Sequence, residues 1–395
     1  MDLTPLARLF LALAAVLLVC RILSMVFTRL RQPVVVAEMC AGIALGPSLL
    51  GTLLPAASHT FVAPDVRPVL AILGQLGVCL YMFLVGMDFS KTLSKRLLVN
   101  SAVVSIPGIV LPLFLGFGTA VLVGVENRIT AIFIGLVLAI TALPVLARII
   151  EERGLRGSKV ASIALAAGLV DDVLAWLLLA LLMAVGVGNG HGPLATLAGL
   201  AVFALVLVFV VRPLLRRIRT PAGLSVVAAL VFGAAAVTDV LGLHLVIGAF
   251  AMGLVFPASE AMQELKRVSV VLLLPFYFVY TGLSVDLRVL ADPRQLAVTG
   301  AFLVVAVAGK VIAGTLATRM TGEGWRAAVQ VGVLMNARGL MQLVALDIGL
   351  RSGLISQTLY SELVVVAVIT TLLTGPLLGL VERVSPQRQP AAAAR

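Results

Sequence analysis

Apolar runs of about 20 residues recur along the whole chain, and they limit its fold more than any other feature. A helix of that length spans the hydrocarbon core of a lipid bilayer. Only 12% of the residues are charged and the mean hydropathy is +1.16, whereas soluble domains carry roughly 25% charged residues. The alternating pattern of membrane β-strands is absent from the sequence. The sequence therefore predicts an all-α polytopic membrane protein.

We expect about thirteen transmembrane helices within a single domain over residues 1–384, followed by a short disordered tail over 385–395. No Walker motif or dinucleotide fingerprint occurs, so we expect neither ATP-driven transport nor a cofactor. The expected spans are roughly 6–28, 33–51, 67–87, 99–124, 129–150, 158–188, 195–215, 223–238, 241–256, 268–284, 296–318, 325–350 and 356–381.

Basic residues alternate between the two ends of these spans in a biased way. If the N-terminus lies outside, nineteen Lys and Arg residues fall in inside segments and six in outside segments. Loops on the cytoplasmic side carry such an excess, which predicts an external N-terminus and an internal C-terminus in an inner or plasma membrane. The same bias explains the net charge of +11, so we expect a lipid bilayer and no nucleic acid as partner.

The two halves of the chain resemble each other weakly. "YMFLVG" at 81–86 matches "YFVYTG" at 277–282, and "AGIALGP" at 41–47 matches "GAFAMGL" at 248–254. The first two motifs lie in the third and tenth expected spans. Because an odd number of spans separates them, the halves would have opposite topology. This is the inverted-repeat arrangement of secondary transporters.

Helix-breaking residues interrupt the fifth and the twelfth spans, again seven spans apart. "AITALPVLARI" contains Thr141 and Pro144, and "LMNARGLMQLV" contains Asn336, Arg338 and Gly339. Proline removes a backbone donor and disturbs the preceding helical turn. Freed carbonyls can coordinate cations, and half-helix ends need polar or charged neighbours, a role that we expect for Asn336 and Arg338. Interrupted helices at matching positions indicate a binding site near the membrane midplane.

Four of the charged side chains inside the expected spans matter most: Asp171 and Asp172 in "GLVDDVLAW", Lys310 in "VAVAGKVIAGT", and Arg338. A charge at the bilayer centre costs about 2.5–3.5 kcal/mol, so such residues are candidates for function. Adjacent helical residues point about 100° apart. One acid can therefore face a water-filled cavity while the other pairs with Lys310. A buried ion pair with a purely structural role is the alternative.

Burial raises the pKa of a carboxyl group, so a buried Asp can accept a proton near cellular pH. A carboxylate that binds either a proton or a monovalent cation, with access alternating between the two sides, is sufficient for exchange. No enzymatic activity is expected. An intramembrane aspartyl protease needs two acids that converge from different helices, whereas these two are adjacent.

These residues resemble those of the monovalent cation:proton antiporter-2 family, and the similarity covers almost the whole chain. The family includes bacterial sodium/proton antiporters, potassium efflux proteins and plant cation/proton exchangers. The matching stretches are "QPVVVAEMCAGIALGPSLLG" (32–51), "ITALPVLARIIEERGL" (140–155), "ALAAGLVDDVLAW" (164–176), "TDVLGLHLVIGAFAMGLVFP" (238–257), "LPFYFVYTGLSVDL" (274–287) and "MNARGLMQLVALDIG" (335–349).

The resemblance implies a sodium/proton antiporter-like fold with two crossing broken helices and an elevator-like movement. A core over about 99–188 and 296–381 would move against a dimerisation panel over about 6–87 and 223–284, in a homodimer.

The resemblance also assigns roles to residues. Asp172 would bind the metal cation or the proton, Asp171 would pair with Lys310, and Thr141 would adjoin the ion site. The implied function is exchange of Na+ or K+ for H+ by alternating access. Two alternatives stay open: a transporter of an organic cation or pathway product, and a cation channel or sensor on the same fold.

Overall fold

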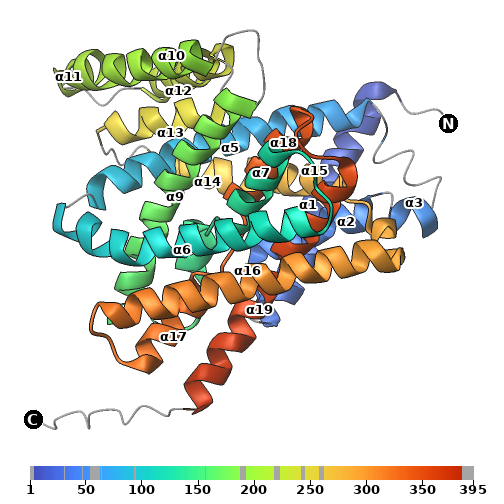
Figure 1. Cartoon of the computed structure of the whole chain (residues 1–395). Helices are drawn as coiled ribbons and strands as arrows, with labels where there is room; N and C mark the ends of the chain where they lie inside the picture. Colours follow the sequence, from blue (N-terminus) through green and yellow to red (C-terminus); the bar gives the residue numbers. More distant parts are fainter. Residues whose placement is uncertain are drawn as a thin grey trace, which may run out of the picture.

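The computed structural model describes residues 4–30, 32–46, 48–53, 63, 65–92, 95–155, 157–186, 193–217, 223–241, 245–257 and 262–384. Within these ranges every regular element is a helix, as Figure 1 shows. The predicted disordered tail, 385–395, lies outside the described residues.

The principal α-helices are, in chain order, α1 (Pro5–Arg29), α2 (Val34–Leu45), α3 (Leu50–Leu53), α5 (Val66–Thr92), α6 (Lys95–Leu122), α7 (Arg128–Ala139), α8 (Leu143–Glu152), α9 (Lys159–Gly186), α10 (Pro193–Val206), α11 (Arg212–Arg217), α12 (Leu224–Val240), α13 (Leu245–Val255), α14 (Met262–Val268), α15 (Leu274–Leu283), α16 (Pro293–Met320), α17 (Trp325–Leu334), α18 (Leu340–Arg351) and α19 (Gln357–Val384). Short π-helical turns, η1 (Leu207–Val211) and η2 (Ser269–Leu273), continue α10 into α11 and α14 into α15, and η3 (Leu287–Ala291) is a 3-10 turn.

These helices account for the thirteen predicted spans. Nine helical segments in the described residues are long and apolar enough to cross a membrane, and α12 and α13 are shorter apolar helices. The remaining two spans are broken helices, each formed by two consecutive short helices: α7 with α8, and α17 with α18. The prediction of an all-α polytopic fold with two interrupted helices is confirmed.

The repeat motifs pack against each other reciprocally. α2 of the first half contacts α15 of the second, and α5 of the first half contacts α13 of the second. Glycines allow the backbones to meet, because a Cβ atom added to Gly282 would lie 2.7 Å from the Cα of Gly42. A Cβ atom added to Gly86 would lie 3.2 Å from the Cα of Gly253. The two halves therefore interlock, as small residues at membrane helix interfaces permit.

The broken helices lie among α6, α9, α16 and α19. α6 and α16 run side by side in Figure 1, and α6 also contacts α7 and α9. α16 contacts α17 and α19. The charged residues predicted from the sequence come from α9 and α16 and from the interruption between α17 and α18, so this packing brings them together.

Candidate ion-binding site

The two interrupted spans meet at their breaks. Between α7 and α8 the chain is extended at Ile140 and Ala142, and the N–H of Ala142 donates a hydrogen bond to the carbonyl oxygen of Ala337 at 2.9 Å. The Thr141 hydroxyl lies 2.9 Å from the carbonyl oxygen of Met335 and 2.9 Å from Asp171 Oδ2, and these two acceptors share its single proton. Backbone groups that a continuous helix would satisfy are thus bonded across the crossing, as a membrane interior requires.

Asp171 lies at the centre of a buried polar cluster. Its Oδ2 accepts from Lys310 Nζ at 2.7 Å and from Thr141 Oγ1 at 2.9 Å, and its Oδ1 accepts from Ser105 Oγ. Asp171 and Lys310 are both 0% exposed. The pairing of Asp171 with Lys310 that the family resemblance implies is present in the structure. Three helices, α6, α9 and α16, and the extended link between α7 and α8 contribute to this cluster.

Asp172 is buried next to this cluster, and its carboxylate group makes no hydrogen bond with the described residues. Asp172 is 2% exposed. The carboxylate lies beside the N–H of Leu143, the first residue of α8, although no oxygen reaches hydrogen-bonding geometry. An unpaired buried charge is costly, so this carboxyl group needs a proton or a cation. The family resemblance assigned Thr141 to the surroundings of the ion site, and its hydroxyl bonds to Asp171.

Arg338 lies in the second break, between α17 and α18, and is 1% exposed. Its guanidinium donates to the carbonyl oxygens of Val137, at 3.2 Å, and Leu138, which belong to the last turn of α7. It also donates to the carbonyl oxygen of Ala306 in α16, at 3.3 Å. The C-terminal carbonyls of a helix lack intrahelical partners and carry partial negative charge. Arg338 therefore caps the end of α7, which is the structural role predicted for it.

Other predicted residues support the second break. Asn336 Nδ2 donates to the carbonyl oxygen of Thr370 at 3.4 Å. Gly339 precedes α18 in an extended conformation, and a Cβ atom there would lie 2.6 Å from Cγ2 of Val145 on α8. Pro144 occupies the first turn of α8, where a missing N–H costs nothing. Gly339 thus permits the close approach of the two broken helices.

Two participants were missed by the sequence analysis. Ser105 comes from α6 and binds Asp171. Thr371 comes from α19: its hydroxyl accepts from the N–H of Arg338 at 3.2 Å and donates to the carbonyl oxygen of Arg338 at 2.9 Å. Serine and threonine in membrane helices commonly bond their own helix backbone, so residue type alone does not single these two out.

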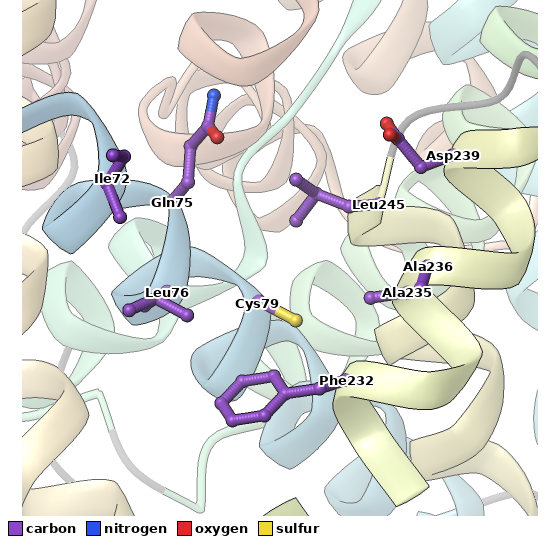
Figure 2. Close-up of a pocket in the computed structure, with 9 residues that line it drawn as sticks. All are labelled: Ile72, Gln75, Leu76, Cys79, Phe232, Ala235, Ala236, Asp239 and Leu245. Atoms are coloured by element: carbon purple, nitrogen blue, oxygen red, sulfur yellow. The ribbon is translucent and has the colours of Figure 1, made fainter. Parts of the chain in front are cut away.

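A separate pocket of about 270 Å³ lies between α5, α12 and α13. Figure 2 shows its mainly apolar lining, with Gln75 and Asp239 as the polar side chains. None of the lining residues belongs to the polar cluster around Asp171. The pocket is therefore distinct from the candidate ion-binding site.

Comparisons with known proteins agree with this architecture. The family model described as "Sodium/hydrogen exchanger, transmembrane" matches residues 14–382. The chain is 33% identical to the Na(+)/H(+) antiporter NhaS4 of Synechocystis, over 95% of this chain and 98% of that protein. It is 30% identical to the K(+)/H(+) antiporter 1 of Saccharomyces cerevisiae and 34% identical to cation/H(+) antiporter 17 of Arabidopsis thaliana. It spans about half the length of these two relatives, 47% and 48%.

The fold is also that of a solved structure. The sodium proton antiporter MjNhaP1 from Methanocaldococcus jannaschii superposes with a TM-score of 0.64 over 95% of this chain and 96% of that chain, at 16% sequence identity. The family match and the NhaS4 similarity each extend over nearly the full length. The chain belongs to the sodium/hydrogen exchanger family of membrane antiporters.

Proposed function

We propose that this protein exchanges a monovalent cation, Na+ or K+, for H+ across a cell membrane, and that Asp172 carries the two ions in turn. The observation that carries the proposal is the environment of Asp172. Its carboxyl group is buried beside a satisfied ion pair, yet it lacks a hydrogen-bonding partner among the described residues. Such a group is free to bind an ion, whereas Asp171 is already neutralised by Lys310.

The mechanism follows from competition at one carboxylate. A protonated Asp172 is neutral and has little attraction for a cation, whereas deprotonation leaves a buried negative charge that a cation neutralises. The two ions therefore exclude each other. Because Asp172 is only 2% exposed, neither ion reaches bulk water from this conformation. Exchange thus requires a change of conformation that opens the site to one side at a time.

We further propose how the molecule is organised. The core, residues 99–188 and 296–381, would carry the ion site past a panel, residues 6–87 and 223–284, that mediates a homodimer. The N-terminus would lie outside and the C-terminus inside the inner or plasma membrane. The packing of both broken helices with α6, α9, α16 and α19 supports a unit that moves together.

The test is ion exchange in proteoliposomes that contain the purified protein and a pH-sensitive dye. We expect Na+ or K+ gradients to drive proton movement, and Asp172→Asn to lower the rate by at least about 100-fold, because the amide cannot exchange a proton or neutralise a cation. Each cation is offered separately across a range of pH.

Asp239→Asn provides the matched control. Asp239 is the penultimate residue of α12 and lines the separate pocket, so the same chemical change there should leave exchange unaltered. Wild-type rates from Asp172→Asn would refute the assignment of the ion site. Cation flux that is indifferent to pH in the unmodified protein would refute antiport itself.

A further inference from the structure

Arg351, the last residue of α18, joins two other helices. Its Nε lies 2.9 Å from Asp347 Oδ2 within α18. Its Nη2 donates to the hydroxyl of Tyr280 on α15 at 3.3 Å, and its guanidinium lies 5.6 Å from the centre of that ring. With the Gln75 amide turned so that its oxygen faces the guanidinium, Gln75 on α5 accepts from both Nη atoms at 3.2 Å. Arg351 therefore connects α18 to α15 and α5.

The start of α19 is bound to the end of α15 at the same end of the molecule. The Tyr360 hydroxyl donates to the carbonyl oxygen of Thr281 at 3.2 Å, and Gln357 Nε2 donates to the carbonyl oxygen of Ser284. The hydroxyl of Ser361 accepts from the N–H of Asp286 at 3.0 Å. These contacts and those of Arg351 form one polar cluster, which we call the α15 clasp. It comprises Gln75, Tyr280, Arg351, Gln357, Tyr360 and Ser361.

The clasp links the two parts that the proposed function sets in motion. α18 and α19 belong to the core, and α5 and α15 lie in the panel or at its edge. α18 begins at Leu340, next to the crossing of the broken helices, and ends at Arg351, about 17 Å away at 1.5 Å per residue. A displacement of the core by a fraction of that length would separate Arg351 from Tyr280 and Gln75. The Asp347 contact lies within α18 and would move with it.

We propose that the α15 clasp holds this end of the core against the panel, so that the ion site is closed toward the face of the membrane where α18 ends. The basic-residue pattern predicts that this face is external. Opening toward it requires Arg351 to leave Tyr280 and Gln75, whereas the Asp347–Arg351 pair persists in both states and keeps the guanidinium positioned for return. The inference rests on the proposed function, because it assumes that the core moves relative to the panel.

A reversible crosslink tests the clasp. In a variant with Cys20, Cys40 and Cys79 replaced by Ala, Gln75→Cys and Arg351→Cys are joined by a short bis-methanethiosulfonate linker. We expect the joined protein to lose at least about 90% of its exchange activity and to regain it when a reductant cleaves the linker. The linker holds the closed conformation, so the conformation that opens this face is no longer populated. Exchange that continues unchanged in the joined protein would overturn the proposal.

The control crosslink joins two residues of the core. The Thr130 hydroxyl of α7 donates to the carbonyl oxygen of Leu354 at 2.9 Å, at the same end of the molecule. Thr130→Cys joined to Leu354→Cys should leave exchange within about twofold of the unjoined protein, since the two residues move together. Equal inhibition by both linkers would show that crosslinking at this end is harmful in itself and would count against the clasp.

A second measurement does not depend on exchange. Thr281 is 1% exposed beneath the clasp, so Thr281→Cys should react slowly with a maleimide. Adding Arg351→Gln should raise that rate by at least about fivefold, since the loss of even one of its hydrogen bonds across the clasp changes the population by that factor. Arg288→Gln is the matched control, because Arg288 pairs only with Asp286 in its own loop, at 2.8 Å, among the described contacts. Equal rates in all three proteins would refute the clasp even if the exchange proposal failed.

Discussion

Asp171 and Lys310 form a charged pair at 2.7 Å with no exposed surface on either side chain. Breaking such a pair by removing one partner typically costs about 3–5 kcal/mol, because the remaining charge stays buried without compensation. We therefore expect Lys310→Met to lower the free energy of unfolding by about that amount and the thermal midpoint in detergent to fall clearly. The double variant Asp171→Asn/Lys310→Met, which buries no charge at this position, should recover most of the loss.

Lys159 and Glu323 provide the comparison for this prediction. Their charged atoms are also 2.7 Å apart, but the Lys159 side chain is 76% exposed. Exposed pairs contribute about 0–1 kcal/mol, so Lys159→Met should have a small effect. A double variant as unstable as Lys310→Met would show that packing of the lysine, rather than its charge, stabilises the site.

Charged side chains of the site could be identified from the sequence, whereas the hydroxyl groups of Ser105 and Thr371 could not. A carboxylate or an ammonium group in an apolar span is improbable without a partner, so Lys310 could be expected to pair with one of the two acids. The family resemblance assigned that role to Asp171, which lies 139 positions away in the sequence. A hydroxyl group costs much less to bury and can bond its own helix. Ser105 and Thr371 therefore carried no signal, and their contacts became evident only from the packing of α6 and α19.

The broken helices also combine features that the sequence predicts with a contact that it does not. Pro144 and Gly339 indicated where the fifth and twelfth spans are interrupted, because proline and glycine disfavour a continuous helix. The hydrogen bond from Ala142 to Ala337 had no sequence signal, since it joins backbone groups of two alanines. The interruptions were predictable, whereas the contact that holds them together was not.

Helix contacts through glycine carry a prediction of their own. A Cβ atom at Gly282 would lie 2.5 Å from the carbonyl oxygen of Met39 and 2.7 Å from the Cα of Gly42, both backbone atoms of α2. Backbone atoms, unlike a flexible side chain, cannot adopt another rotamer to relieve the clash, so Gly282→Ala must push α15 away from α2. Overpacking of this kind costs about 1–3 kcal/mol, and we expect a corresponding fall in the thermal midpoint of the purified protein.

Gly300→Ala is the control for this substitution. A Cβ atom at Gly300 on α16 would meet nothing within 4 Å, so alanine there should be neutral or stabilise the helix by up to about 1 kcal/mol. Similar losses from both variants would mean that helix flexibility, and not the α2–α15 contact, accounts for the effect of Gly282→Ala.

The number of membrane spans was predictable from the sequence, whereas the packing of helices from the two halves was not. Hydropathy gave thirteen spans because each must cross the same thickness of hydrocarbon. The motif similarity between the halves indicated repeats of opposite topology. It did not show that α2 packs on α15 and α5 on α13, each helix against a helix of the other half. This packing between the halves depends on the surface shape at the glycines, and a hydropathy pattern contains no information on that shape.

The orientation of the molecule is a prediction that one helix can test. α16 has 28 residues, about 42 Å at 1.5 Å per residue, and so exceeds the roughly 30 Å hydrocarbon core. Arg294, near its start, and Thr321, just after its end, are exposed and must lie on opposite sides of the membrane. The excess of basic residues predicts that Arg294 lies outside. In a cysteine-free background, a membrane-impermeant maleimide should label Arg294→Cys in intact cells and Thr321→Cys only after the membrane is opened.

Both variants should react equally in detergent, which controls for local accessibility. The reverse labelling pattern in intact cells would show that the orientation is opposite to the predicted one. The α15 clasp would then close the ion site toward the cytoplasm.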